Sequence, residues 1–317
     1  MATYKGIKGV KVPSLASDPT ASESEGSVWY NTTGNALKFG SQGTAAFASG
    51  GALNNSRGYF AGAGTQSAAQ VAGGSPAPMN QKNESYNGTA WTEITALNSG
   101  HSAGTMAGAT HTASLCFSGG GNPTKVLNES WNGSTWTELA DLNTPRDNGP
   151  AGFGTQTAAI CCGGDNPPLT TTETWNGASW SATGALNGGR RNFAGTGIQT
   201  AGIVSGGQGP GSTSSGAETF NGSTWTAVNN LNVAARGITM FGEQGAAYSV
   251  GGGGTADNEY YDGSTWTEVA NLSTGRNDSA GTGSSSAGLV AGGPQSGGTA
   301  TEEWNDPVYT IKTVTVS

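Results

Sequence analysis

The sequence of 317 residues has few basic residues, few cysteines and no long apolar run. Only 13 Lys and Arg stand against 21 Asp and Glu, which gives a formal net charge of −8. Because binding to nucleic acid requires clustered positive charge, we expect no nucleic-acid partner. No stretch approaches the roughly 20 apolar residues that cross a bilayer, and the N-terminal residues lack the apolar run of a signal peptide. We therefore expect no membrane insertion and synthesis in a cytoplasm.

Cysteine and histidine are too scarce to indicate a disulfide framework or a metal site. The three cysteines, Cys116, Cys161 and Cys162, lie shortly before Gly-Gly pairs and are interpreted as small hydrophobic residues. The two histidines, His101 and His111, lie near opposite ends of one predicted strand, and we do not expect them to bind metal. No Ser-His-Asp set and no carboxylate pair outside the repeat pattern indicates catalysis. The sequence therefore predicts no catalytic residue, no cofactor, no metal and no enzyme activity.

Glycine is abundant, and the aliphatic residues that usually form a core are scarce. The 55 Gly and 12 Pro make up about a fifth of the chain, a composition that favours disorder when no period is present. This sequence does have a period, and its nine Trp provide the buried surface that the aliphatic residues lack. The chain is long enough for one large β domain and a small appendage.

A short segment that ends in Trp recurs five times. It consists of an aromatic residue, Asn or Asp, Gly, two small residues and Trp, as in residues 131–136. Asn-Gly readily adopts the backbone angles of a tight hairpin turn, so the flanking residues should form antiparallel strands with both aromatics on one face. The period is typical of propeller blades. The copies end at Trp91, Trp136, Trp180, Trp225 and Trp266, at intervals of 45, 44, 45 and 41 residues.

Other markers recur in register with these hairpins. A Leu follows each Trp by six residues, a Gly-Gly pair precedes each hairpin, and a Glu lies two residues before the first aromatic. The units begin near residues 53, 98, 143, 187, 232 and 273, and each predicts four antiparallel strands, which favours a β-propeller over a solenoid. The residues interpreted as structural markers are Trp91, Trp131, Trp136, Trp175, Trp180, Trp225, Trp266, Trp304, Glu84, Glu129, Glu173, Glu218, Glu259 and Glu302.

The last unit lacks a fourth strand of its own. Trp304 has no second aromatic at the usual spacing, whereas Phe47 precedes Leu53 by the six residues that separate each repeat Trp from its Leu. Residues 44–49 are therefore predicted to complete the last blade, because only this strand continues into Leu53. The alternative is the alternating tail, residues 308–316. The predicted domains are an N-terminal arm, residues 1–34, and an all-β, six-bladed propeller, residues 35–317.

The order Leu-x-x-x-Arg, inner strand, Gly-Gly, aromatic residue and Trp resembles kelch-type β-propeller repeats over about residues 44 to 305. The resemblance implies that Gly-Gly ends the second strand and that Trp packs between blades. The sequence departs from the pattern at His101, which replaces Arg, and at Arg236, which comes one position late. Some kelch-like propellers carry a copper oxidase site, but that site requires convergent His, Tyr and Cys side chains. A degenerate copper oxidase is therefore the least favoured alternative.

The recurrent Glu and Arg residues have two interpretations. The first is a set of structural hydrogen bonds and ion pairs between blades. The second is a charged mouth of the central channel that binds an ion.

Loops that differ from blade to blade are the expected place for binding, because rigid scaffolds present function on such loops. The variable loops follow the Gly-Gly pairs and should gather on one propeller face. They are polar and rich in Pro, which suits contact with a glycan or a protein, although they contain no aromatic platform for a sugar. The candidate binding residues are Asn80, Asn122, Asp165, Asn166, Gln208 and Gln295.

The N-terminal region, with residues 26–33 and Leu37-Lys38, resembles virion structural and fibre proteins of tailed bacteriophages, especially those of marine hosts. The resemblance implies that the arm binds other virion proteins and that the propeller faces outward. We therefore expect a non-enzymatic virion component, a fibre, tail or capsid-surface protein. It would contact a host-surface glycan or protein or stabilise the particle, and we expect a homo-oligomer on the particle. The alternative is a soluble carbohydrate-binding propeller.

Overall fold

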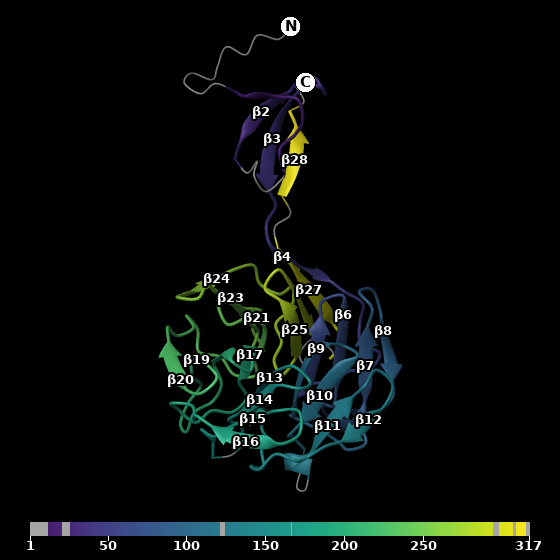
Figure 1. Ribbon diagram of the computed structural model, residues 1–317, viewed down its shortest axis with the longest axis vertical. Coiled ribbons are helices and arrows are strands. Elements are labelled where there is room, and N and C mark those ends of the chain that lie inside the picture. Colours follow the sequence, from purple (N-terminus) through teal and green to yellow (C-terminus); the bar gives the residue numbers. More distant parts are fainter. Residues whose placement is uncertain are drawn as a thin grey trace. The chain divides into compact units, whose positions relative to one another are not determined.

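The chain folds into β-strands that divide into two compact units (Figure 1). Unit 1 combines Met1–Ala46 with Asp306–Ser317, and unit 2 is Phe47–Asn305. The helices of the described residues are two single 3₁₀ turns, η2 (Met79–Gln81) and η3 (Thr124–Val126). The structure is a computed structural model that describes residues 12–20, 26–120, 124–165, 167–293, 298–306 and 309–314.

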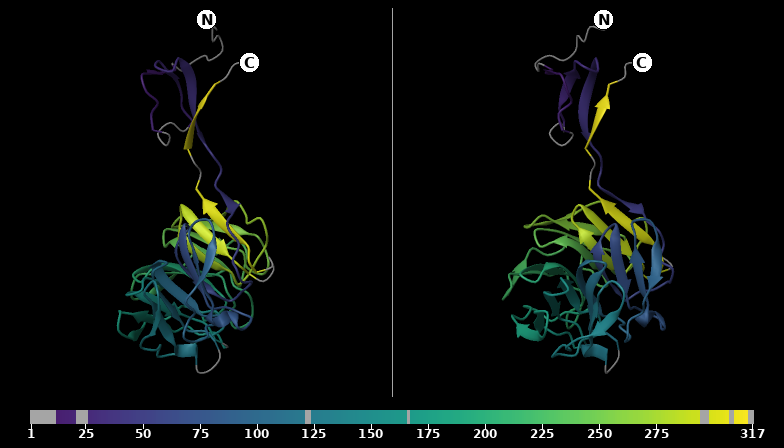
Figure 2. Two further views of the ribbon diagram at one scale, coloured as in Figure 1. Left: turned by 90° about the vertical axis from the view of Figure 1, so that its right-hand side faces the viewer. Right: turned by 45° about the vertical axis from the view of Figure 1, so that its right-hand side comes forward.

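Unit 1 contains one four-stranded sheet to which both ends of the chain contribute (Figures 1 and 2). In the order in which they pair, its strands are β1 (Ser14–Leu15), β2 (Val28–Asn31), β3 (Ala36–Gln42) and β28 (Tyr309–Thr313). Strands β2 and β3 form an antiparallel hairpin, β1 runs parallel to β2, and β28 runs antiparallel to β3. Trp29 is buried in this unit.

The boundary between the units differs from the sequence-based domains. The sequence places residues 35–317 in the propeller, whereas β3 and β28 belong to unit 1. The physical reason is strand pairing. β3 is hydrogen-bonded to β2 on one side, and the alternating tail occupies its other side, with Ile311 opposite Gly40. All of unit 2 is therefore inserted between two neighbouring strands of unit 1.

Unit 2 contains six four-stranded antiparallel sheets, and each repeat supplies the strands of one sheet in sequence order. The first two sheets are β5 (Ala61–Thr65), β6 (Ala68–Ala72), β7 (Asn83–Tyr86) and β8 (Trp91–Ile94), then β9 (Thr105–Thr110), β10 (Ala113–Phe117), β11 (Asn128–Trp131) and β12 (Trp136–Glu138). The next two are β13 (Ala151–Gly154), β14 (Ala159–Cys162), β15 (Thr172–Trp175) and β16 (Trp180–Thr183), then β17 (Ala194–Ile198), β18 (Ala201–Ser205), β19 (Ala217–Phe220) and β20 (Trp225–Val228). The last two are β21 (Thr239–Glu243), β22 (Ala246–Val250), β23 (Asn258–Tyr261) and β24 (Trp266–Glu268), then β25 (Ala280–Ser284), β26 (Ala287–Ala291), β27 (Thr301–Asn305) and β4 (Ala46–Ser49).

The predicted count of six four-stranded sheets is wrong for the chain as a whole, because the described residues form seven. The additional sheet is that of unit 1. Its pairing between β3 and β28 joins residues that are distant in the sequence, such as Lys38 and Thr313, and leaves no repeat signal. The sheets are separate, and none closes on itself. The fold of unit 2 is nevertheless propeller-like: its first strands contact one another in the order β5, β9, β13, β17, β21 and β25, and β25 contacts β5.

The last sheet of unit 2 takes its fourth strand from the N-terminal side of the unit. β4 lies beside β27, in the place for which the sequence predicts residues 44–49, and the tail pairs with β3 instead. The Phe47 ring packs edge-on against Trp304, with 5.2 Å between centroids, where other repeats have two aromatics of one hairpin. The Gln66 side-chain amide also joins the first sheet to the last, since it donates to the carbonyls of Gly288 (3.1 Å) and Trp304 (2.6 Å).

The aromatic pairs lie directly across the hairpins. Trp131 is the register partner of Trp136, and their ring centroids are 5.3 Å apart. The turn between them is a four-residue loop in which the Asn132 side chain accepts the N–H groups of Ser134 and Thr135, and Gly133 has a φ of +93°. The repeat motif thus encodes a hairpin with two large rings on one face.

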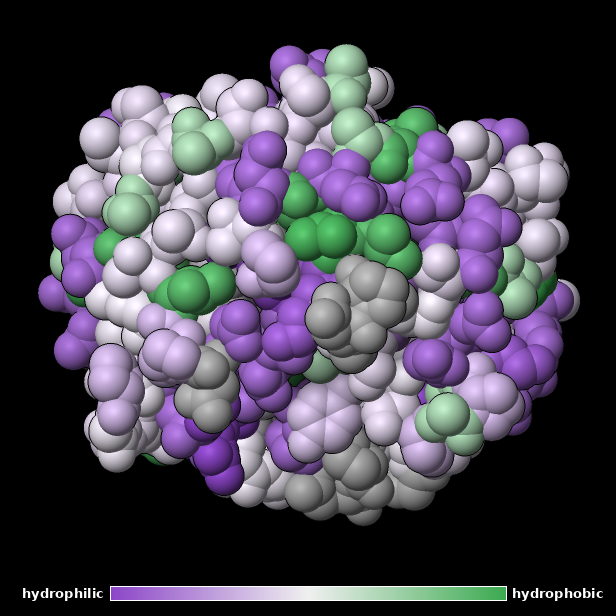
Figure 3. All heavy atoms as spheres, turned by 90° about the horizontal axis from the view of Figure 1, so that it is seen from below, coloured by the Kyte–Doolittle hydropathy of each residue, from purple (hydrophilic) through white to green (hydrophobic). Residues whose placement is uncertain are grey.

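The core lies between neighbouring sheets. One cluster joins Phe153 and Ile160 of one sheet to Val204, Phe220 and Trp225 of the next. All eight Trp markers of the sequence analysis are buried. On the face drawn in Figure 3, strongly hydrophobic residues form small separate groups among polar and weakly hydrophobic ones.

Glycine in the inner strands makes room for this core, which gives a first prediction. A Cβ atom added at Gly202 in β18 would lie 2.2 Å from the ring of Phe153, which is buried in the neighbouring sheet. Gly202→Ala should therefore destabilise the protein by about 1–3 kcal/mol, because the ring has little space to move. Thermal or denaturant unfolding measures the effect.

Gly188→Ala is the matched control for this substitution. Gly188 is exposed, and an added Cβ would meet no atom within 4 Å. Its effect should stay within about 0.5 kcal/mol. Equal stability of the two variants would contradict the packing of these sheets against each other.

Candidate functional site

Each repeat buries the Glu that the sequence analysis singles out. Glu173 of β15 is 1% exposed and is paired with Arg146, with 3.1 Å between Nη2 and Oε1. The Arg146 guanidinium also donates to the carbonyls of Gly163 (2.9 Å) and Thr171 (2.8 Å). The same ion pair occurs in four repeats: Arg57 with Glu84, Arg146 with Glu173, Arg190 with Glu218 and Arg276 with Glu302.

The buried Glu holds the linker that enters each sheet. The backbone and side-chain N–H groups of Asn143 donate to Glu173 at 2.8 and 2.9 Å, and the Thr144 N–H donates at 3.0 Å. The pair therefore joins a linker to the third strand of the sheet that the linker enters, rather than joining two blades as the sequence analysis expects. The two cavities described below include none of the six buried Glu among their lining residues.

Two repeats lack the Arg–Glu pair, and these are the two departures noticed in the sequence. His101 takes the place of Arg in the second repeat, with Nδ1 2.7 Å from the Ser118 carbonyl and Nε2 3.3 Å from Glu129. In the fifth repeat, the N–H groups of Asn232 and Val233 donate to Glu259. Arg236 is exposed and donates instead to the side chain of Gln208 (3.1 Å).

One residue of each repeat forms a ring at one end of the inner strands, which we call the mouth ring. All six have a left-handed backbone, with φ between 49° and 66°. Five backbone hydrogen bonds of 2.7–3.0 Å link neighbouring members. One of the five runs from the Tyr59 N–H to the Asp278 carbonyl (2.8 Å) and connects the first repeat to the last. The mouth ring consists of Tyr59, Ala103, Asn148, Asn192, Gly237 and Asp278.

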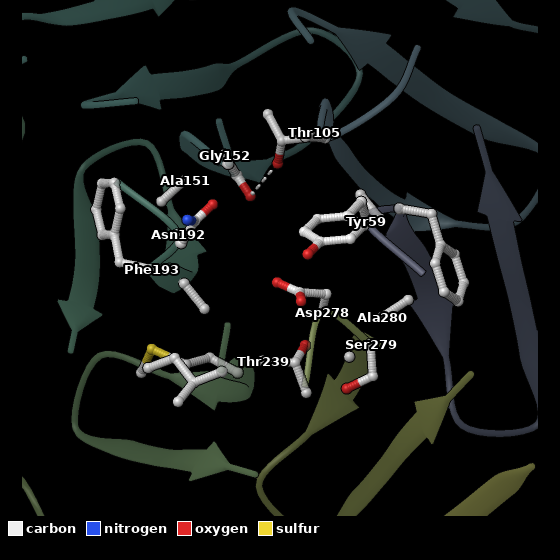
Figure 4. A pocket seen from close by; sticks show the side chains of 18 of the residues that line it. Tyr59, Thr105, Ala151, Gly152, Asn192, Phe193, Thr239, Asp278, Ser279 and Ala280 are labelled. Atoms are coloured by element: carbon white, nitrogen blue, oxygen red, sulfur yellow. Dashed lines mark hydrogen bonds between the residues drawn. The ribbon is translucent and has the colours of Figure 1, made fainter. Parts of the chain in front are cut away.

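A cavity of about 310 Å³, which we call the mouth pocket, lies at this ring. A smaller cavity of about 100 Å³ shares Tyr59, Asn192, Gly237 and Asp278 with the mouth pocket and is lined by the first strands of all six sheets. In Figure 4, the Tyr59 ring and the Asp278 carboxyl group approach each other at the cavity, with Asn192 on another side. The mouth pocket is lined by Tyr59, Asn192, Arg236, Gly237, Gly253, Asn277 and Asp278.

The acidic group of the mouth pocket is strongly influenced by its surroundings. Burial raises the pKa of the Asp278 carboxyl group, and a hydrogen bond with Tyr59 and the charge of Arg236 only partly oppose this effect. Asn277 donates its side-chain N–H to Asp278 (2.6 Å). The negative charge of Asp278, together with burial, raises the pKa of the Tyr59 hydroxyl group. The pocket therefore combines a partly desolvated carboxyl group, an aromatic ring, amides and one cation, which suits a polar ligand.

The predicted loop residues have different surroundings. Asn80 lies in η2, where its carbonyl accepts the His101 N–H (2.8 Å). Asp165 is 3.6 Å from the Lys125 ammonium group. Gln208 accepts hydrogen bonds from Arg191 and from Arg236, and Arg236 lines the mouth pocket. The remaining three candidates, Asn122, Asn166 and Gln295, lie outside the described residues.

The sequence analysis missed Tyr59, Asn192 and Asp278. A signal was present, because all three follow a repeat Arg by two residues. Asn, Gly and Asp, which fill four positions of the mouth ring, are the residues that best tolerate a left-handed backbone. Tyr is unusual in that conformation, and an alignment of the repeats on Arg would have marked it.

The three cysteines are buried, as expected for small core residues. Burial raises the pKa of all three thiols, that of Cys161 to about 12. Such thiols are poor nucleophiles. Within the described part of the chain, no group of three or more His, Cys, Asp or Glu side chains is placed to hold a metal ion.

Comparison with models of protein families finds no match, and comparison with curated proteins finds no significant similarity. Among the described residues, no helix has the length and apolar character needed to cross a membrane.

The buried Glu predicts a pH-dependent stability. Burial opposes ionisation of Glu173, but hydrogen bonds from Asn143 and the charge of Arg146 outweigh it and hold its pKa below the ordinary value. A lowered pKa stabilises the fold above the unfolded pKa of about 4.3 and loses this contribution as the pH falls through the folded pKa. Glu173→Gln should lower Tm by a few °C at neutral pH, corresponding to about 3 kcal/mol, and should reduce the loss below pH ~4.3.

The exposed Glu138 provides the control, and Glu138→Gln should leave Tm unchanged. Unfolding curves between acid and neutral pH test both variants. An unchanged Tm of Glu173→Gln together with loss of a bound ion would contradict the structural role and favour the ion-binding interpretation.

The raised pKa of Asp278 predicts a pH dependence of stability that is opposite to that of Glu173. Because its folded pKa is raised, its ionised form destabilises the fold, and this effect grows as the pH rises through the unfolded pKa of about 3.9. Asp278→Asn should therefore raise Tm slightly at neutral pH, since Asn also tolerates the left-handed backbone. The gain should disappear below pH ~3, where the carboxyl group is protonated in both states. A lower Tm at neutral pH would show that the carboxylate supports the fold.

Proposed function

We propose that this chain is a non-enzymatic structural protein of a tailed-bacteriophage particle. Unit 1 attaches to other virion proteins, and unit 2, a six-bladed kelch-like propeller, is presented for contact with the host surface or for stabilisation of the particle. The resemblance of residues 26–38 to phage virion proteins supplies the type of particle. Several copies on one particle, as a homo-oligomer, are part of the proposal.

The observation that carries the proposal is the insertion of unit 2 between β3 and β28 of unit 1. Both described ends of the chain belong to unit 1, so this unit has its own sheet and its own side-chain network. The Asp18 carboxylate accepts hydrogen bonds from the Trp29 indole (2.9 Å) and from the Asn31 amide (2.6 Å). Such a division separates an anchoring module from a displayed one.

The arrangement of unit 2 supports a role in display rather than catalysis. Its buried ionic groups join linkers to strands, and its buried thiols have raised pKa values. The mouth pocket is lined by the charged side chains of Arg236 and Asp278 and by the amides of Asn192 and Asn277. A rigid scaffold with polar groups at one opening is typical of binding proteins.

A soluble carbohydrate-binding propeller is the second candidate. The mouth pocket favours it, because the Tyr59 ring there provides the aromatic surface that the variable loops lack. This candidate does not require a particle.

Disruption of unit 1 tests attachment. Trp29 is 1% exposed, and Trp29→Ala removes an indole whose loss from a core costs about 3–5 kcal/mol. The variant should unfold unit 1 and disappear from purified particles while unit 2 remains folded. Particle fractions probed for the protein, together with circular dichroism of the purified chain, measure both effects.

Ile198→Ala is the control, because Ile198 is an exposed apolar residue of unit 2, with 55% exposure. This variant should stay in the particle fraction. Absence of the unaltered protein from purified particles would contradict the virion proposal and leave the soluble carbohydrate-binding protein.

A further inference from the structure

We propose that the mouth pocket binds a neutral sugar residue at the end of a glycan, with the Tyr59 ring against the apolar face of the sugar and Asp278 and Asn192 as partners of its hydroxyl groups. The inference deepens the proposed host contact and rests on it for the source of the glycan. The chemistry of the pocket itself does not depend on a particle.

Tyr59 is the residue that points most directly to a ligand. A left-handed backbone is unfavourable for a bulky side chain, and Tyr59 adopts it with a φ of +56°. Burial of the side chain does not explain why Tyr occupies this position, because Tyr59 remains 42% exposed. The mouth ring holds the backbone through two hydrogen bonds, from the Tyr59 N–H to Asp278 and from the Ala103 N–H to Tyr59. Strained residues held by their surroundings are concentrated at functional sites.

The aromatic ring of Tyr59 has the properties of a surface on which a sugar can pack. It is partly exposed and lines a cavity of about 310 Å³, which is at the lower end of the range for small-molecule sites. One sugar residue can occupy such a volume while the rest of a glycan stays in solvent. Aromatic rings with a polar edge combine apolar contact with hydrogen bonding.

Asp278 and Asn192 provide the groups that pair with hydroxyls. An ionised carboxylate can accept about four hydrogen bonds, and an amide both donates and accepts. Asp278 receives one from Asn277 (2.6 Å) and interacts with Tyr59, which leaves capacity toward the cavity that it lines. Neighbouring hydroxyl groups of a sugar can supply donors to this carboxylate and acceptors to the Asn192 amide.

The charges of the pocket favour a neutral ligand. Asp278 and Arg236 both line it and carry opposite charges, so neither an anion nor a cation finds an uncompensated partner. Arg236 is fixed by its hydrogen bond to Gln208, which also accepts one from Arg191. A polyhydroxylated neutral ligand can use both the carboxylate and the guanidinium without leaving a desolvated charge unpaired.

Tyr59→Gly separates binding from stability. Glycine adopts a left-handed backbone without strain, so this variant should fold with an unchanged or slightly higher Tm while losing the aromatic surface. Binding of the full chain to glucose, galactose and mannose is measured by saturation-transfer NMR, and binding to immobilised glycans with neutral or acidic ends is measured on an array. The unaltered protein should bind at least one neutral sugar, and Tyr59→Gly should weaken this binding roughly 10-fold or more.

Two further variants complete the test. Asp278→Asn should also weaken sugar binding while its Tm at neutral pH does not fall. Asn148→Gly is the matched control. Asn148 is the mouth-ring residue of its own repeat, as Tyr59 is of the first, but it does not line the mouth pocket. This variant should bind the sugar as well as the unaltered protein does.

The proposal is overturned if no neutral sugar binds, if only acidic glycans bind, or if Tyr59→Gly binds as well as the unaltered protein. These outcomes are independent of the virion proposal, which particle fractionation tests. If the chain binds a sugar through Tyr59 but does not fractionate with particles, the sugar site is supported and only the virion proposal is overturned.

Discussion

The buried carboxylate of each repeat is the interaction on which the path of the chain through unit 2 depends. A carboxylate removed from water must be fully hydrogen-bonded or paired. Glu173 meets this requirement through Asn143, Thr144 and Arg146, which all lie against β15. The linker therefore has one path into its sheet. Since Asn148 follows Arg146 by two residues, the same interaction also fixes where the mouth ring forms.

The fifth repeat connects this framework to the candidate site. There, backbone N–H groups satisfy Glu259 and the Arg is displaced by one position. The displaced Arg236 is exposed, contacts Gln208 and lines the mouth pocket together with Asp278. The shift of Arg236 by one position thus breaks the sequence pattern of the repeat and also brings a cation to the mouth pocket.

The repeated part of the fold could be predicted from the sequence, whereas the parts that occur once could not. Hairpins such as that of Trp131 and Trp136 depend on local turn chemistry, which five copies make conspicuous. The pairing of β3 with β28 depends on contact between distant segments and leaves no periodic signal. The mouth pocket was missed for a related reason. Its residues are neighbours only after the six repeats come together, and Tyr59 lies in a linker, outside the loops that vary between repeats.

The residues of the mouth ring differ in how well they suit the left-handed backbone that the fold requires of them. Asn148, Asn192 and Gly237 are residues that suit a left-handed backbone, and the ring needs nothing more from its members than that backbone. Tyr59 and Asp278 differ, because the first is strained and exposed and the second carries a carboxyl group whose ionisation burial opposes. Asn at either position would serve the fold at least as well. Tyr59 and Asp278 thus contribute less to folding than Asn would, and both line the same cavity. This is the strongest reason to regard the mouth pocket as a binding site.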